Sequence, residues 1–560
     1  MKRLPFSHAT SVFLIAALTA GPLAAQQTPP PEMPKLTVNI DVRVIGVDVV
    51  VTDKKGNPVT GLTKDNFQIF ENGIEKPISN FSEVEAKQAK PVVAAPSAPA
   101  TPPAPKEPIN EHLTRRIIFY IDNLSLAPFN RNRVFKQMKD FVRDVMRPGD
   151  EAMVATYNRS LKVRVPFTRD IVQIQQTLDA ISGESGLGIA ANSESKDVMG
   201  RINDAQTYDE AVADARSYAD SVAHDLRQSV ESINGLLTTL AGVDGKKILV
   251  LTTEGFQMQP GREAFTLIDE VAKDKGWQSS SMLEGMSYNS GSQIESIAKT
   301  ANANGITLYA IHAGGLAAGN EGMSADNQQP ISYNVTSAAL SSSTESLEML
   351  AELTGGLATT RTNNFTGAFK DIMRDLDSYY SIGYRASTER VDRQRSLEVR
   401  VNNKNLRVRN RQTFVEKSTF QEMSDRVVAN LLYQTRENVL GVQVKVNSPV
   451  PAEDLFKIPV EVRIPIDNLA LLQQGESFMG GFSIYVVVGN KDGDMSDVSR
   501  KSHQITIPAA EFAKAKGKYY TYTLDLMCER GLNKISVGVV DDVSNVSGFD
   551  RQQVIASDMR

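Results

Sequence analysis

The chain has 560 residues, which is enough for about three domains of ordinary size. Its formal charge of −5 argues against nucleic acid as the main partner, because such partners select basic surfaces. The single cysteine, Cys528, excludes an intramolecular disulfide, so packed cores must hold the fold together.

Residues 1–25 have the layout of a secretory signal peptide. Lys2 and Arg3 precede the apolar run Val12–Ala20, and small residues follow it up to Ala25. The run is too short to span a membrane, and no later stretch offers the required run of about 20 apolar residues. We expect an exported protein without a transmembrane segment, which is secreted or stays in the periplasm or cell envelope.

Residues 36–84 alternate apolar and polar side chains, as in VNIDVRVIGVDVVVTD, and therefore predict a β segment. The dipeptide Asn72-Gly73 lies between two short strand patterns and favours a hairpin turn. Residues 85–113 are rich in Pro and Ala and have almost no large apolar side chain, so we expect an extended linker there.

Residues 114–378 change to a repeating order of strand and helix. Short continuous apolar strands, such as IIFYID, ILVLTT and ITLYAIH, alternate with amphipathic helical patterns. This order is typical of an α/β domain with a mostly parallel sheet and helices on both faces. Ligands of such sheets bind in the loops at the carboxyl ends of the strands.

The rest of the chain returns to β structure. Residues 379–416 predict a β-hairpin, residues 419–438 a helical connector, and residues 439–560 a C-terminal β-sandwich with turn signals about every ten residues. The segments 36–84 and 379–416 are each too small to be stable alone. We therefore predict that they pair into one β-sandwich into which the α/β domain is inserted.

Polar side chains follow two strands that are expected to be neighbours in the sheet. Asp122, Asn123 and Ser125 come after IIFYI, and Thr253 and Glu254 come after ILVL. Because the carboxyl ends of parallel strands meet at one edge of a sheet, these side chains form our candidate partner-binding site.

At these two loops the chain resembles the von Willebrand factor type A domain, which carries a metal-ion-dependent adhesion site there. The family pattern is Asp-x-Ser-x-Ser after one strand, a threonine from a middle loop and a Thr-Asp-Gly turn after a later strand. By this resemblance Asp122, Ser125 and Glu254 are the candidate ligands of Mg²⁺ or another divalent cation. The third and fifth loop positions are Leu124 and Leu126, which offer no oxygen, and Glu254 stands in place of the aspartate.

The site is therefore a degenerate one, and two roles remain open for its acidic side chains. They hold a cation with few protein ligands, or they cap helices and bind backbone amides. The missing oxygens favour the second role, because a hard cation needs several oxygen ligands.

Trp277 lies in the Ser/Gly-rich stretch KDKGWQSSSMLEGMSYNSGS, which follows the Glu254 loop. Loops carried by a rigid sheet are places where ligands bind, so Trp277 is a candidate contact residue. The alternative is that Trp277 anchors this stretch to a helix, since aromatic side chains serve both purposes.

Several motifs also resemble the von Willebrand factor A-related family described from acidobacteria. They are VDVVVTDKKGNPVTGLTKDNFQIFENG, LEMLAELTGGLATT, FKDIMRDLDSYYSIGYRA and LEVRVNNKNLRVRNRQTF, in this order. The resemblance covers about residues 38–415 and implies an exported bacterial protein. It implies much less about residues 421–560.

We predict an exported, non-catalytic binding or adhesion protein that presents the A-type domain to a protein partner. No histidine-containing metal motif or nucleophile motif occurs in the sequence, so we expect that the protein is not an enzyme. One alternative is an exported enzyme that acts on envelope polymers. A second is a structural assembly subunit, which would show apolar patches or unpaired strand edges. The sequence predicts neither the identity of the partner nor the oligomeric state.

Overall fold

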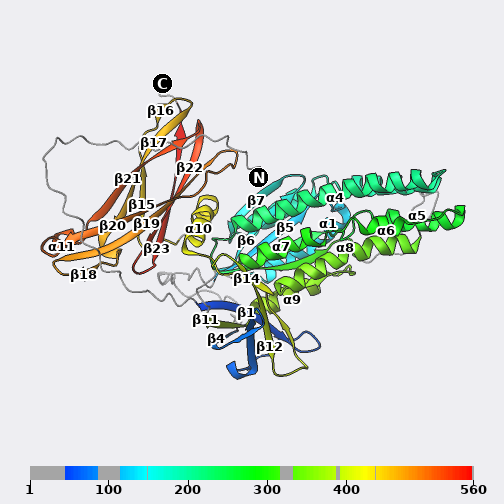
Figure 1. The fold of residues 1–560 in the computed structure, drawn as a ribbon, viewed down its shortest axis with the longest axis horizontal. Coiled ribbons are helices and arrows are strands. Elements are labelled where there is room, and N and C mark those ends of the chain that lie inside the picture. The colour runs from blue at the N-terminus through cyan, green and yellow to red at the C-terminus, as the bar shows by residue number, and fades with distance from the viewer. Residues whose placement is uncertain are drawn as a thin grey trace, which may run out of the picture.

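The computed structural model describes residues 44–85, 114–147, 149–315, 332–385, 391–434 and 437–557. The expected signal peptide at 1–25 and the Pro/Ala-rich linker, apart from Glu85, lie outside the described residues. Within them the chain is a mixed α/β protein with five sheets, which form a central α/β unit, a flanking β unit and a C-terminal β unit (Figure 1).

A six-stranded sheet with the order β10-β9-β8-β5-β6-β7 is the centre of the α/β unit. All neighbouring pairs are parallel except β6 and β7, which are antiparallel. The strands are β5 (Arg115–Asp122), β6 (Glu151–Tyr157), β7 (Leu161–Thr168), β8 (Lys246–Thr253), β9 (Ile306–His312) and β10 (Ala358–Thr359).

Helices cover both faces of this sheet, because successive residues of its buried strands point to opposite sides. In β5, Ile117, Phe119 and Ile121 pack against α1 (Pro128–Asp144), α2 (Ile171–Ser182) and α9 (Thr366–Asp377). Ile118 and Tyr120 pack against α4 (Tyr208–Thr239), α7 (Gly291–Ala303) and α8 (Tyr333–Thr354). The mostly parallel sheet with two helical layers agrees with the pattern of apolar strands in the sequence.

A helical extension projects past the carboxyl edge of the sheet (Figure 1). It contains α3 (Gly188–Asp204), the first half of the 32-residue helix α4, α5 (Arg262–Lys275) and α6 (Ser281–Met286), and these helices share an apolar cluster of their own. The sequence pattern did not predict α3, whose middle is polar and whose buried residues are few. Tertiary packing against α4 and α5 compensates for this weak local pattern.

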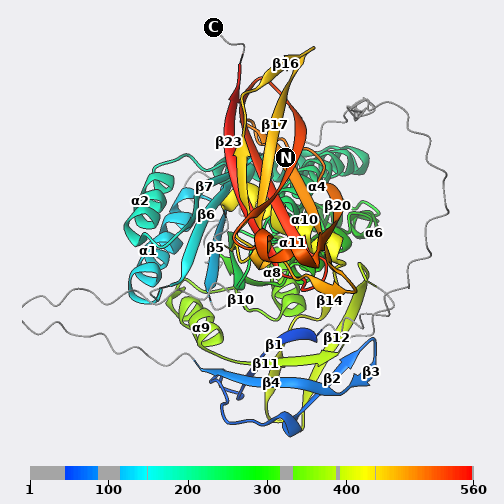
Figure 2. The same ribbon diagram turned by 90° about the vertical axis from the view of Figure 1, so that its left-hand side faces the viewer.

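The flanking β unit joins two segments that are far apart in sequence (Figure 2). One sheet has the order β13-β1-β11-β4 and the other β14-β12-β2-β3. β11 lies between β1 and β4, with Val49 opposite Tyr380 and Ser82 opposite Ser381, so both segments contribute to one sheet. The strands are β1 (Val44–Thr52), β2 (Phe67–Glu71), β3 (Ile74–Lys76), β4 (Ile78–Glu85), β11 (Ser378–Arg385), β12 (Gln394–Val401), β13 (Arg407–Arg409) and β14 (Thr413–Val415).

Both sheets of the flanking unit share one apolar core, which includes Val49, Ile69 and Tyr384. Asn72 and Gly73 form the predicted hairpin turn between β2 and β3, with φ values of 50° and 78°. Within the segment 379–416, which we predicted as a closing hairpin, β12 pairs antiparallel with β14. β13, which lies between them in sequence, pairs with β1 of the other sheet.

The C-terminal β unit also consists of two sheets around one core, which includes Val460, Ile484 and Val537. One sheet contains β15 (Gln443–Val446), β16 (Val450–Ala452), β17 (Leu455–Pro465) and β21 (Tyr519–Cys528). The other contains β18 (Leu472–Gln474), β19 (Ser477–Asn490), β20 (Ser499–Pro508), β22 (Gly531–Asp541) and β23 (Ser547–Ala556), and α11 (Ala509–Ala515) follows β20.

One helix, α10 (Thr419–Tyr433), lies between the α/β unit and the C-terminal unit (Figure 1). Its residues Met423, Val427 and Leu431 pack against β19, β22 and β23. Ala429 and Tyr433 join the core of the α/β unit instead. A helix with apolar residues on both sides is buried against both neighbours, so α10 joins the two units through packed surfaces.

Candidate functional site

The two loops singled out in the sequence do meet at the carboxyl edge of the sheet. β5 ends at Asp122, β8 ends at Thr253, and the two strands are direct neighbours, with Ile121 opposite Thr252. The side chains that follow these strand ends are therefore within contact distance of one another.

Asp122, Ser125 and Thr253 form a closed hydrogen-bonded network. The Ser125 hydroxyl donates to Asp122 Oδ2 at 2.7 Å, and the Thr253 hydroxyl donates to the same oxygen at 2.8 Å. The two hydroxyl oxygens are 3.0 Å apart. Backbone amides of Glu254 and Gly255 donate to Ser125 Oγ at 3.1 Å and Thr253 Oγ1 at 3.0 Å. The network thus ties the first loop to the second.

The network is enclosed by protein. Asp122 is 2 % exposed and Thr253 is fully buried. Burial raises the pKa of the Asp122 carboxyl, and the hydrogen bonds from Ser125 and Thr253 act in the opposite direction. Asp122 Oδ1 has no hydrogen-bond partner among the described residues, although it is buried. This atom is the one polar group of the network that is left unsatisfied.

Glu254 has a capping role in the structure. Its Oε1 accepts hydrogen bonds from the Ala127 amide at 2.8 Å and from Asn130 Nδ2 at 3.1 Å. Ala127 is the N-cap residue of α1 and has no side chain that could cap the helix. The Glu254 carboxylate supplies that acceptor from the loop after β8, at the helix end where negative charge is favourable. This contact joins two loops that are over 120 residues apart, so no local sequence signal marks it.

Asn123 fixes a different loop. Its Oδ1 accepts from Arg131 Nη1 at 3.2 Å, and its backbone carbonyl accepts from the Leu187 amide at 3.1 Å. Arg131 is fully buried, and its Nη2 donates to the carbonyls of Ser182 and Glu184. Asn123 and Arg131 together hold the connection between α2 and α3 against the candidate site.

A divalent cation does not fit the residues as they are placed. Leu124 and Leu126 pack into the cores on opposite faces of the sheet, and Glu254 directs its carboxylate to the start of α1. One buried carboxylate and two hydroxyls remain, whereas Mg²⁺ requires near-octahedral oxygen coordination. Within the described ranges, no group of three or more His, Cys, Asp or Glu side chains is arranged for a metal.

Trp277 is not brought into this network. It lies after α5, a helix of 14 residues, and packs partly buried against the apolar cluster of the helical extension. Lys275 Nζ lies 5.0 Å from the centre of the indole ring. The structure therefore gives Trp277 the contacts of an anchor for the stretch after α5.

An exposed aromatic residue that the sequence analysis missed lies at the same edge of the sheet. Phe129, the second residue of α1, is 77 % exposed, and the Arg133 guanidinium lies 5.8 Å from its ring. Arg133 Nη2 donates to the Ala313 carbonyl at 2.6 Å and to Asn130 Oδ1 at 3.3 Å. We call Phe129, Asn130, Arg133 and Glu254 the top-loop surface. A single aromatic side chain at a helix start has no periodic pattern that would reveal it.

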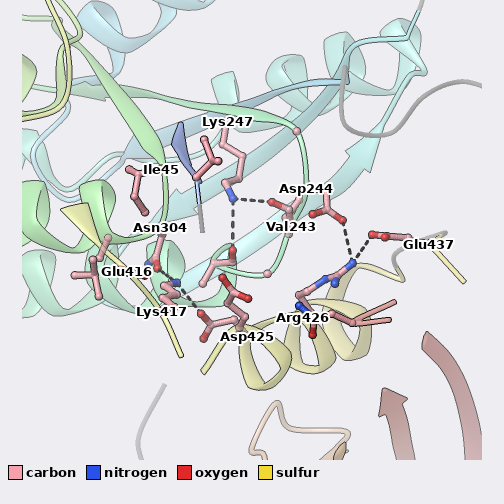
Figure 3. A pocket seen from close by; sticks show the side chains of 18 residues that line it. Ile45, Val243, Asp244, Lys247, Asn304, Glu416, Lys417, Asp425, Arg426 and Glu437 are labelled. Carbon is pink, nitrogen blue, oxygen red and sulfur yellow. Dashed lines mark hydrogen bonds and ion pairs between the residues drawn. The ribbon is translucent and has the colours of Figure 1, made fainter. Parts of the chain in front are cut away.

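A second polar site lies at the opposite, amino end of the sheet (Figure 3). A cavity of about 630 Å³ separates the start of β8 from α10 and the end of β14. Lys247 Nζ donates to the Val243 carbonyl at 2.6 Å, Lys417 pairs with Asp425 at 2.6 Å, and Arg426 lies between Asp244 and Glu437. Burial, followed by the charge of Lys417, lowers the pKa of Lys247 to about 7. We call this set the basal junction.

Comparisons with known proteins add only distant likenesses. No protein-family model matches the chain, and no curated protein matches it either. An aerotolerance-related membrane protein from Bacteroides fragilis, with multiple mutations to serines, is 12 % identical over 47 % of this chain and 98 % of its own, with a TM-score of 0.24. The conserved hypothetical protein BatB from Bacteroides thetaiotaomicron is 9 % identical over 47 % of this chain and 97 % of its own, with a TM-score of 0.22.

Proximal thread matrix protein 1 from the mussel byssus, in a structure with a zinc-occupied MIDAS motif, is 14 % identical, with a TM-score of 0.22. The match covers 50 % of this chain and 50 % of the mussel protein, so this chain spans half of that relative. All three TM-scores are below 0.5.

Proposed function

We propose that this chain is an exported, non-catalytic binding protein whose type A-like α/β domain presents the top-loop surface to a protein partner. The observation that carries the proposal is Phe129, which is 77 % exposed at the ligand-binding edge of the sheet. Large aromatic side chains with such exposure are typical of interaction sites, because their burial on binding removes much apolar area from water.

The top-loop surface is held rigidly, which reduces the entropy lost on binding. Arg133 is fixed by the Ala313 carbonyl and supports the Phe129 ring, and Glu254 caps the helix that carries both residues. Beneath them the Asp122 network locks the two loops together. Aromatic and arginine side chains on a fixed support are the composition found at interface hot spots.

Recognition by this surface would need no bound cation and no chemical turnover. The acidic side chains of the degenerate adhesion site are used inside the protein, so shape and the Phe129–Arg133 pair would provide the contact. Export rests on residues 1–25, and we propose the cell envelope or the exterior as the location. Among the described residues, no helix is both long and apolar enough to cross a membrane.

Site-specific photo-crosslinking in producing cells tests the proposal. p-Benzoylphenylalanine is placed at Phe129 in one variant and at Val172 of α2, which is 59 % exposed, in the control. We expect a discrete protein adduct from position 129, in the presence or absence of EDTA, and none from position 172. Absence of an adduct at 129, or the same adducts from both positions, would overturn the proposal. An adduct that EDTA abolishes would show that the partner binds this surface through a divalent cation.

A further inference from the structure

β21 exposes a long unpaired edge at one side of the C-terminal β unit (Figure 1). All ten residues of β21 pair with β17, from Tyr519 opposite Pro465 to Cys528 opposite Phe456. No other strand among the described residues pairs with its outer edge. In an antiparallel ladder alternate residues direct their N–H and C=O groups away from the partner strand. About half of the backbone groups of β21 therefore face outward.

This edge lacks the charges that normally protect an edge strand from pairing. Asp525 is the one charged residue of YYTYTLDLMC, and it is paired with Lys457 at 2.7 Å. The other edge strands of comparable length carry at least two charged residues each. These are Glu83 and Glu85 in β4, Lys162 and Arg164 in β7, Arg500 and Lys501 in β20, and Asp550 and Arg551 in β23.

Among the residues that the structure describes, no helix packs against this edge either. α10 packs against β19, β22 and β23, which belong to the other sheet. Tyr519 is 46 % exposed and Met527 is 52 % exposed, at the two ends of the outer face of β21. On the inner face Tyr520, Tyr522, Leu524 and Leu526 are only partly buried against the core. The strand thus leaves apolar surface open on both faces.

The sequence of β21 is complementary to itself in an antiparallel arrangement. Pairing centred on Thr523 places Tyr519 opposite Met527 and Thr521 opposite Asp525. On the inner face it places Tyr520 opposite Leu526 and Tyr522 opposite Leu524. Aromatic side chains opposite aliphatic ones are stabilising cross-strand pairs, and a threonine hydroxyl can donate to a carboxylate. Pairing centred on Asp525 would instead oppose two carboxylates, so the charge pattern disfavours that register.

We propose that two copies of this chain associate through their β21 edges, in an antiparallel pairing with a two-fold axis at Thr523. The same surface serves both copies, as in an isologous interface, and the pairing joins two four-stranded sheets into one. This inference does not depend on the proposed role of the top-loop surface, because it uses a different unit of the molecule.

A concentration series of the full chain by sedimentation velocity tests this interface. Wild-type protein is expected to shift from monomer to dimer as the concentration rises. Thr523→Lys places two positive charges face to face at the axis and is expected to weaken dimerisation at least tenfold, as is Thr523→Asp. An equimolar mixture of the two variants should form the dimer again, which a folding defect would not allow. Thr506→Lys, on the exposed face of β20, is the matched control and should leave the dimer unchanged.

Three results would overturn the proposal. They are a monomer at every concentration of the wild-type chain, a dimer that persists in Thr523→Lys, and a mixture of the two variants that does not dimerise. The persistent dimer would assign the association to another surface.

Discussion

The two ends of the central sheet hold their polar groups in different ways. At the carboxyl end, hydroxyls and backbone amides surround one buried carboxylate, and the contacts stay within the α/β unit. At the amino end, two cationic side chains near α10 reach the α/β unit. Arg426 lies 3.9 Å from Asp244, and Lys417 Nζ donates to Asn304 Oδ1 at 2.7 Å. Hydrogen bonds to one buried carboxylate fix loops whose outer surface is free to be recognised, whereas cationic side chains fix a joint between units.

The largest effect is expected at the joint, from Gly242→Ala. A Cβ atom on Gly242 would lie 2.2 Å from the backbone carbonyl oxygen of Asp425, so α10 would have to move. Overpacking against backbone is expected to lower the free energy of unfolding by about 3 kcal/mol. Urea unfolding measures the loss. Gly200→Ala is the control, because Gly200 lies in the helix α3 with open space around it. This substitution should raise the free energy of unfolding by up to about 1 kcal/mol. Equal effects of both substitutions would contradict the tight contact.

Lys247→Met should change how stability depends on pH. Lys247 titrates at about 7 in the folded protein, and a lysine in the unfolded chain titrates near about 10.4. Between these two pH values the unfolded chain binds more protons than the folded protein. Burial of the charged amine therefore lowers the free energy of unfolding most below pH 7, and this loss declines as the pH rises. Relative to Lys247→Met, the wild type should gain about 1 kcal/mol per pH unit between about pH 7 and 9.

Urea unfolding at pH 7, 8 and 9 measures this difference. Lys162→Met, on the exposed edge strand β7, is the control, and its pH profile should run parallel to that of the wild type. A parallel profile for Lys247→Met as well would show that the buried amine does not titrate in this range.

At the other end of the sheet, Asp122→Ala removes the acceptor of two hydroxyls, of which that of Thr253 is fully buried. It should lower the free energy of unfolding by about 1 to 2 kcal/mol at pH 5. Asp122→Asn keeps one acceptor oxygen and should cost less. Because burial raises the pKa of Asp122, its carboxyl stabilises the folded protein most at low pH. This stabilisation falls as the pH rises through the pKa of the folded state. Thermal unfolding of the three proteins at pH 5 and 8 checks the order. A larger loss of stability in Asp122→Ala at pH 8 than at pH 5 would contradict the expected direction of the pH dependence.

The smallest effect is expected from divalent cations. Titration with Mg²⁺ or Mn²⁺ in a calorimeter should give the same heat for the full wild-type chain and for Asp122→Ala. The reason is that one carboxylate and two hydroxyls provide too few ligands for the cation. A saturable heat signal that is lost in Asp122→Ala would show that the loops rearrange to bind metal. In that case the carboxyl end of the sheet would be a cation site and not a network that only fixes loops.

The parts of the fold that were predictable are those with local patterns. The apolar strand IIFYID, the alternation of strands with helices and the Asn72-Gly73 turn each follow from short-range chemistry. Asp122, Ser125 and Thr253 were found because the ends of parallel strands share an edge. The resemblance to the type A family remains a prediction.

Other features depend on contacts between residues that are distant in sequence. Glu254 caps α1 from the loop after β8, and Gly242 leaves room for the backbone at Asp425. The basal junction arises because α10 brings its charges to the start of β8. β13 leaves its predicted hairpin because β1 offers it a free edge. None of these pairs has a pattern that can be read from one segment.

The packing of α10 against two units affects how a pair of chains would bind a repeating target. Because its apolar residues contact both the α/β unit and the C-terminal unit, it acts as a spacer of fixed length and not as a tether. In a pair joined at β21, the two top-loop surfaces would stand at a set distance and orientation. Such a pair would bind strongly to a target that repeats with the same spacing, through a high effective concentration for the second contact. It would bind only as single sites to a target whose repeat does not match.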